Sequence, residues 1–114
     1  MTWGEVELGP EVEQRFLGLP TGHRGTVAFH VDPPATRGPL LSEPYTRQLG
    51  GKLRELRFHL DTDAVRITYW IASGRRIILL TVFRKQRMRE TAEVDRARRA
   101  MVRCVAEQHT VDEV

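Results

Sequence analysis

The sequence predicts an α+β fold in which helices pack against a small sheet. Two observations between Gly50 and Met101 support it: three consecutive strand-like runs, and an apolar pattern of helical spacing that follows them. A third observation is a short strand-like run near the N-terminus, followed by a helix pattern that begins at a proline. Strand side chains alternate every two residues and helical ones repeat every 3.6 residues, so the two patterns differ along the chain.

The length of 114 residues predicts one domain with a small core. We expect residues 1–49 to form an N-terminal strand, helix and covering segment. Residues 50–108 should form the strands, a basic turn and the C-terminal helix, and residues 109–114 a tail. No apolar run has the length needed to cross a bilayer, and the N-terminal glutamates are the reverse of a secretory signal. We therefore expect a cytoplasmic protein with no membrane contact.

The N-terminal elements are marked by glycine and proline. Residues 6–8 can form a short strand, which Gly9 ends. Pro10 tolerates the first turn of a helix, and acidic residues just after it complement the positive end of the helix dipole. Gly18 and Pro20 should end this helix.

The stretch from residue 21 to residue 41 fits two patterns. Residues 27, 29 and 31 alternate like a strand, yet residues 26–31 equally continue a helix. Pro33-Pro34 interrupts either one. We expect a helix-like or irregular cover followed by a loop.

The three strand-like runs are clearest between Leu53 and Phe83. In the first run Leu56, Phe58 and Leu60 share one face, and in the second Val65, Ile67, Tyr69 and Ile71 do so. Alternation predicts one buried and one presented side for both runs. The third run, residues 77–83, is apolar on both faces and should be the central strand. Turns at residues 61–63 and 72–74 connect the runs.

A C-terminal helix is predicted from about Glu90 to Gln108. Its apolar residues follow helical spacing, and arginines occupy the remaining surface. Asp95 and Arg99 form an i,i+4 pair worth about 0.2–0.5 kcal/mol. Cys104, the only cysteine, excludes an internal disulfide and should pack in the core.

Positive charge is concentrated in the second half of the chain. Residues 52–103 contain fourteen Lys and Arg against six acids, whereas residues 1–51 contain four against six. Many of these cations fall opposite the apolar positions of the strands, so the sheet should present a positive surface. A polyanion is the partner that such a surface suggests, and a well-solvated arginine-rich surface is the alternative.

The segment from about Leu49 to Met101 resembles the RelE superfamily of bacterial toxins, specifically its phage Gp49-like or HigB branch. Four segments carry the resemblance in order and spacing: KLRELRFH, VRITYW, RIILLTVFRKQ and EVDRARRAM. The second segment departs from the family pattern because it does not begin with an aromatic–Arg pair. Gln86 replaces a common Thr, and Arg89-Glu90 replaces a frequent Thr-Pro.

The resemblance implies a twisted, mainly antiparallel sheet with helices on one side, as in small microbial ribonucleases. It also implies the toxin of a type II toxin–antitoxin system that cleaves messenger RNA on the translating ribosome. The implied partners are ribosomal RNA and a helix-turn-helix antitoxin. Operator DNA is contacted only through the antitoxin. Two alternatives stay open: a non-catalytic toxin of the related gyrase-inhibiting branch, and an inactive module that binds nucleic acid or antitoxin.

The resemblance implies site roles for Arg57, Arg66 and the pair Arg84-Lys85. RNA is cleaved when its 2′-hydroxyl attacks the neighbouring phosphate, so the site must neutralise phosphate charge and move protons. The expected catalytic residues supply charge or proton transfer: Arg57, Arg66, Lys85, Lys52 and His59. The expected RNA-binding residues add cations and one aromatic ring: Arg54, Trp70, Arg84, Arg87 and Arg89. The sequence has no metal-ligand or phosphate-loop motif, so we expect no metal and no cofactor.

Overall fold

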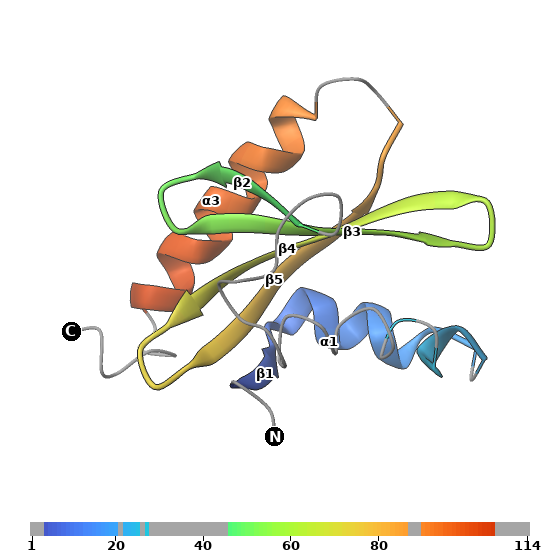
Figure 1. The fold of residues 1–114 in the computed structure, drawn as a ribbon, viewed down its shortest axis with the longest axis horizontal. Coiled ribbons are helices and arrows are strands. Elements are labelled where there is room, and N and C mark those ends of the chain that lie inside the picture. The colour runs from blue at the N-terminus through green and yellow to red at the C-terminus, as the bar shows by residue number, and fades with distance from the viewer. Residues whose placement is uncertain (1–3, 21, 26, 28–45, 87–89, 107–114) are drawn as a thin grey trace.

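In the computed structural model, which describes residues 4–20, 22–25, 27, 46–86 and 90–106, five strands form one mixed sheet between helices (Figure 1). The strand order is β1-β5-β4-β3-β2. β1 pairs with β5 in parallel, and the other neighbours are antiparallel. The predicted α+β class and mainly antiparallel sheet are confirmed.

The N-terminal elements form where the sequence predicts them. β1 (Glu5–Leu8) is followed directly by α1 (Pro10–Leu17), with proline in the first turn. Gly9 joins the two elements and donates its N–H to the carbonyl of Leu79, 2.7 Å away. A Cβ at Gly9 would lie 2.6 Å from that carbonyl oxygen, so only glycine allows this close approach.

The three predicted strand runs are β3 (Leu53–Leu60), β4 (Asp63–Ala72) and β5 (Arg76–Arg84). β5 is an interior strand, as expected, but β4 is the middle one. β2 (Thr46–Gly50) was not predicted. It is a short edge strand without clear apolar alternation, so periodicity gives no signal for it.

One side of the sheet, here called the α1 face, is an apolar core. It carries Leu56 and Phe58 from β3 and Ile67 and Tyr69 from β4. Val12 of α1 packs against them. The apolar sets predicted from alternation in β3 and β4 therefore share this face.

The other side, here called the α3 face, carries the alternate residues and is also covered. α3 (Thr91–Ala106) packs Ala97 and Cys104 against Trp70 and Ile78. Helices therefore lie on both sides of the sheet, and the expectation of helices on one side was wrong. The expectation that the second run, β4, presents one side to solvent was also wrong. The apolar stripe of α3 is buried against sheet residues, and this contact buries those residues as well.

Side chains hold α3 at the edge of β5. The carboxylate of Glu11 accepts hydrogen bonds from the Val82 N–H, at 3.0 Å, and from the guanidinium of Arg96. Arg96 also bonds Glu93, at 2.9 Å. Burial alone lowers the pKa of Arg96, but these hydrogen bonds outweigh it and raise the pKa above its ordinary value.

Two further expectations concern an ion pair within α3 and the segment that follows α1. Arg96 takes the ion pairs of α3, and no ion pair joins Asp95 to Arg99 in the described residues. Residues 22–25 and 27 are helical, whereas Pro33-Pro34 lies outside the described residues. No helix in the described ranges has the length and apolarity required to cross a membrane.

Candidate functional site

Three charged side chains, Glu55, Arg57 and Arg66, come together on the half of the α3 face that lies away from its apolar core. Arg57 of β3 and Arg66 of β4 lie directly opposite each other in the sheet register. Glu55, two residues before Arg57, projects on the same side. One of its carboxylate oxygens, Oε1, lies 3.9 Å from the Nε atom of each arginine. The carboxylate thus sits between two guanidinium groups.

This charge cluster is largely buried. Glu55 and Arg66 are each 7% exposed. Burial lowers the pKa of Arg66, the positive charge of Arg57 lowers it further, and Glu55 opposes both effects. The group still carries its charge, because arginine is not deprotonated in proteins. A second anion placed here would therefore be attracted by both guanidiniums.

Arg57 and Arg66 also have hydrogen-bonding capacity that the fold leaves open. The Nε of Arg57 is buried and has no hydrogen-bond partner among the described residues. Arg66 donates through Nη1 to the carbonyl of Val65, at 3.1 Å. A guanidinium has five N–H donors in a fixed plane, so the pair can still donate to an oxyanion.

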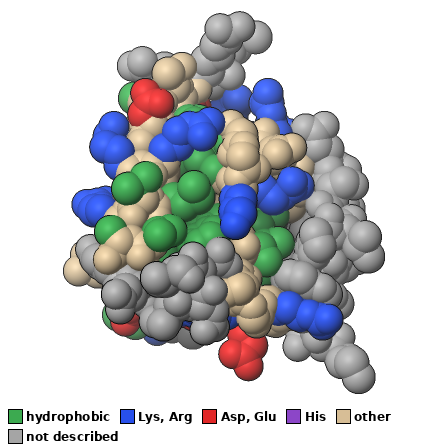
Figure 2. All heavy atoms as spheres, turned by 90° about the vertical axis from the view of Figure 1, so that its left-hand side faces the viewer, with side chains coloured by type: hydrophobic (Ala, Val, Ile, Leu, Met, Phe, Trp, Pro, Cys, Tyr) green, Lys and Arg blue, Asp and Glu red, His purple; other side chains and the backbone are tan. Residues whose placement is uncertain are grey.

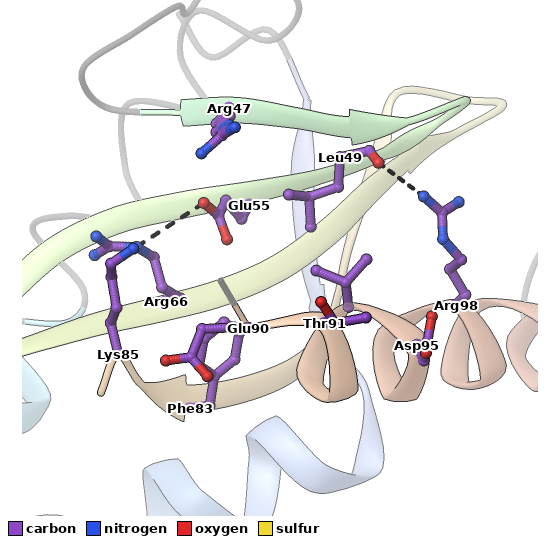
Figure 3. Close-up of a pocket in the computed structure, with 11 residues that line it drawn as sticks. Arg47, Leu49, Glu55, Arg66, Phe83, Lys85, Glu90, Thr91, Asp95 and Arg98 are labelled. Carbon is purple, nitrogen blue, oxygen red and sulfur yellow. Dashed lines mark hydrogen bonds and ion pairs between the residues drawn. The ribbon is translucent and has the colours of Figure 1, made fainter. Parts of the chain in front are cut away.

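A pocket of about 450 Å³ opens between this cluster and the N-terminal half of α3 (Figure 3). The sheet supplies Arg47, Leu49, Glu55, Arg66, Phe83 and Lys85, and the helix side supplies Glu90, Thr91, Val94, Asp95 and Arg98. The pocket exists because the start of α3 does not cover the half of the α3 face that carries Glu55 and Arg66. Its size suits a small polar ligand or one nucleotide unit.

The start of α3 is fixed to the end of β5. The backbone carbonyl of Glu90 accepts the first helical hydrogen bond, from the N–H of Val94 at 2.9 Å. The side chain of Glu90 accepts the N–H of Gln86 at 2.7 Å. The main chain of Lys85 in turn donates to Ala64, at 2.8 Å. Lys85 is therefore positioned beside the first turn of the helix.

The opposite end of the pocket is closed by a contact between α3 and β2. Arg98 donates from Nη2 to the carbonyl of Leu49, at 2.7 Å. This contact lies at a register irregularity between Gln48 and Gly50, where Gly50 has a φ of 131°. A Cβ at Gly50 would lie 2.7 Å from the same arginine nitrogen. A glycine therefore permits both the backbone bend and the helix contact.

The pocket is mixed in charge. Four cations and three acids line it. The expected positive surface is therefore wrong for the pocket itself, because Glu55 and the acids of α3 offset much of the charge. On the side of the molecule seen in Figure 2, Lys and Arg side chains surround a hydrophobic area, and acidic side chains are visible only near its upper and lower margins.

The predicted catalytic residues separate into two groups. Arg66 and Lys85 line the pocket, and Arg57 adjoins it through Arg66 and Glu55. Lys52 instead lies at the β2–β3 turn, with its Nζ 5.9 Å from the centre of the Trp70 ring. His59 is exposed near the far end of β3 and does not line the pocket.

The predicted RNA-binding residues are not gathered at the pocket. Arg54 projects on the α1 face and donates to the Thr46 hydroxyl at 2.9 Å, and the exposed Arg84 donates to the carboxylate of Asp63 at 3.5 Å. Trp70 is 2% exposed, so its expected stacking surface is covered, because α3 packs over it. Arg87 and Arg89 lie outside the described residues.

Sequence reasoning missed several residues that line the pocket. Glu55 was not among the predicted site residues, although strand alternation places it on the same face as Arg57. Arg47 and Leu49 belong to the unpredicted strand β2. Glu90, Thr91 and Asp95 lie at or near the start of α3, and no sequence pattern says which part of the sheet a helix leaves open.

The family comparison covers most of this architecture. A family model described as phage derived protein Gp49-like (DUF891) matches residues 14–102, well over half of the chain. The match includes β2 to β5 and most of α3, and thus every residue that lines the pocket. No curated protein matches the chain.

Proposed function

Because the chain belongs to the Gp49-like family, a family of RelE/HigB-like toxins, we propose that it cleaves messenger RNA on the ribosome as the toxin of a type II toxin–antitoxin system. Family membership itself suggests the toxin role. The RNA-cleaving activity is the further step, and it rests on the pocket. There Arg66, Lys85 and Glu55 combine permanent positive charge with a carboxylate.

This combination fits the chemical needs of RNA cleavage through the 2′-hydroxyl. The 2′-oxygen must lose its proton, form a bond to phosphorus and displace the 5′-oxygen, which must gain a proton. The products are a 2′,3′-cyclic phosphate and a 5′-hydroxyl. No metal or cofactor is required by this route, since the substrate supplies the nucleophile and protein groups supply the proton transfers.

Each polar residue of the cluster has a role in the proposed reaction. The carboxylate of Glu55 accepts the proton of the 2′-hydroxyl. Arg57 and Arg66 hold the non-bridging oxygens of the phosphate, where negative charge grows in the transition state. The ammonium group of Lys85 gives a proton to the leaving 5′-oxygen. Glu55 is held between the arginines, so little reorganisation is needed when substrate enters.

The partners follow from the same proposal. A helix-turn-helix antitoxin neutralises the toxin and links it to operator DNA. Ribosomal RNA contacts cations outside the pocket, and the candidates from the sequence are Arg84, Arg87 and Arg89. The proposed place of action is the cytoplasm, where messenger RNA is translated.

The test is inducible expression in a bacterial host while the 5′ ends of transcripts are mapped. We expect growth arrest and new 5′ ends within translated regions, both suppressed by the antitoxin. Glu55→Gln should reduce cleavage about 10²- to 10⁴-fold, the usual contribution of a general base. Glu13→Gln removes the same charge from an exposed position on α1 and should leave cleavage unchanged.

Two results would contradict the proposal. Growth arrest without new 5′ ends, accompanied by DNA breaks, would assign the protein to the gyrase-inhibiting class. Cleavage that persists in Glu55→Gln would remove the carboxylate from the mechanism. Because the variant leaves the buried guanidinium of Arg66 and the partly buried one of Arg57 without their acid, its thermal unfolding should be measured beside that of the wild type.

A further inference from the structure

We propose that the end of the pocket between β2 and α3 is a subsite for one guanine base, read by Asp95 and Arg98. The inference rests on the proposed function and adds a substrate preference to it. Arg66 and Lys85 lie at one end of the pocket, and Leu49, Asp95 and Arg98 lie at the other (Figure 3). A nucleotide has the same two-part character, with its charge at the phosphate and its base beyond the sugar.

The β2–α3 end is unsuited to a second phosphate. The carboxylate of Asp95 repels an anion at this end. The same end offers apolar surface from Leu49 on β2 and Val94 on α3. A flat ring can lie between these side chains while its edge reaches polar groups.

The polar groups at this end match the hydrogen-bonding edge of guanine. An ionised carboxylate has two acceptor oxygens, and guanine carries two adjacent donors, N1–H and the N2 amino group. Beside them is its O6 acceptor, to which a guanidinium of Arg98 can donate. Adenine and cytosine present one amino group beside an acceptor, and uracil presents a single N–H. Only guanine uses both oxygens of the carboxylate together with the arginine.

The two reading residues are available and well placed. The side chain of Asp95 has no hydrogen bond or ion pair with any described residue, and it is exposed and lines the pocket. Asp95 and Arg98 are three residues apart on α3, a spacing that puts them on the same side of a helix. Arg98 is held by the Leu49 carbonyl through Nη2 at 2.7 Å, which leaves donors on its other nitrogens. The site is thus formed before the base enters.

Binding of the four nucleoside 3′-monophosphates to the purified full chain tests the subsite without cleavage. We expect guanosine 3′-monophosphate to bind at least about tenfold more tightly than the other three, the discrimination of a good two-point contact. Asp95→Asn should abolish most of this difference, because the amide replaces one acceptor by a donor. Glu13→Gln, which removes the same charge on the opposite side of the sheet, should preserve it. Equal binding of all four nucleotides to the wild type would overturn the proposal.

Mapping of cleavage sites provides the second readout. In wild-type maps, guanine should be enriched at one fixed position beside the cut. Asp95→Asn should remove the enrichment, and the cuts that remain should show no preferred base at that position. Cleavage with no base enrichment, or with the same enrichment in Asp95→Asn, would sink the subsite and leave the nuclease intact. Absence of cleavage together with Asp95-dependent guanosine binding would instead reject the nuclease and keep the subsite.

Discussion

The two faces of the sheet are built from the same alternating strands, yet they have different compositions. On the α1 face, apolar side chains such as Leu56, Ile67 and Leu79 continue across the interior strands. On the α3 face, the apolar core is confined to the half next to the β2–β3 and β4–β5 turns, and Glu55 and Arg66 occupy the other half. The candidate site therefore lies where one face stops being a core.

The difference follows from how each helix meets the sheet. A single residue, Gly9, separates β1 from α1, and its backbone hydrogen bond fixes the start of α1 to the interior of the sheet. α3 is fixed at the end of β5 and buries Ala97 and Cys104 against the sheet, while its first turn lies beside the pocket. A polar cluster is tolerated under the first turns of α3 because water and substrate can reach it there.

The largest expected effect lies on the α1 face. Leu56→Ala should lower the free energy of unfolding by about 2–5 kcal/mol, because the side chain is 2% exposed and its loss leaves a cavity. Urea unfolding followed by circular dichroism measures this. Val102→Ala, at a site that is 64% exposed on α3, should change stability by less than about 0.5 kcal/mol. Similar losses at both sites would contradict a continuous core on the α1 face.

The second-largest expected effect is a difference in RNA cleavage rate between variants of the two lysines of the chain. Lys85→Gln should lower the rate of RNA cleavage about 100-fold, because Lys85 lines the pocket beside Arg66. Lys52→Gln removes the same charge from the β2–β3 turn and should change the rate by less than about threefold. Initial cleavage rates in a purified translation reaction provide the comparison. Equal losses would mean that the whole basic surface, rather than the pocket, determines the rate.

Much of the fold was predictable because it depends on local patterns. Period-two alternation located β3 and β4, a run apolar on both faces located β5, and proline with glycine bounded α1. β2 was missed because its sequence, TRQLG, has neither alternation nor β-branched residues beyond Thr46. Its strand conformation comes from pairing with β3, a tertiary effect that local sequence does not encode.

The candidate site was predictable only in part, for a related reason. Alternation placed Arg57 and Arg66 on one side of the sheet, and the structure pairs them across strands. The same alternation placed Trp70 on the same face as Arg66, and nothing in it indicated that α3 would cover Trp70 and leave a pocket over Arg66. Which part of a face a helix covers depends on the path of the chain, so residues supplied by α3 were beyond a strand-based prediction.

The border between the two halves of the α3 face is marked by two buried threonines. Thr68 of β4 and Thr81 of β5 are paired in the register, next to a bulge. Their hydroxyl oxygens are 2.5 Å apart, and Thr68 Oγ1 also accepts the backbone N–H of Thr81 at 3.1 Å. The Thr68 hydroxyl thus serves two groups of its neighbour, whereas the Thr81 hydroxyl serves one.

This asymmetry predicts unequal costs for two substitutions of the same shape. Thr68→Val leaves the N–H and the hydroxyl of Thr81 without their partner and should lower stability by about 1–3 kcal/mol. Thr81→Val keeps the N–H bond and should cost about 1 kcal/mol or less. The double variant should cost less than the sum, because the hydroxyl pair is then removed from both sides. Urea unfolding of the three variants measures the coupling. Equal costs for the two single variants would show that the hydroxyl pair, rather than the Thr81 N–H bond, stabilises this border.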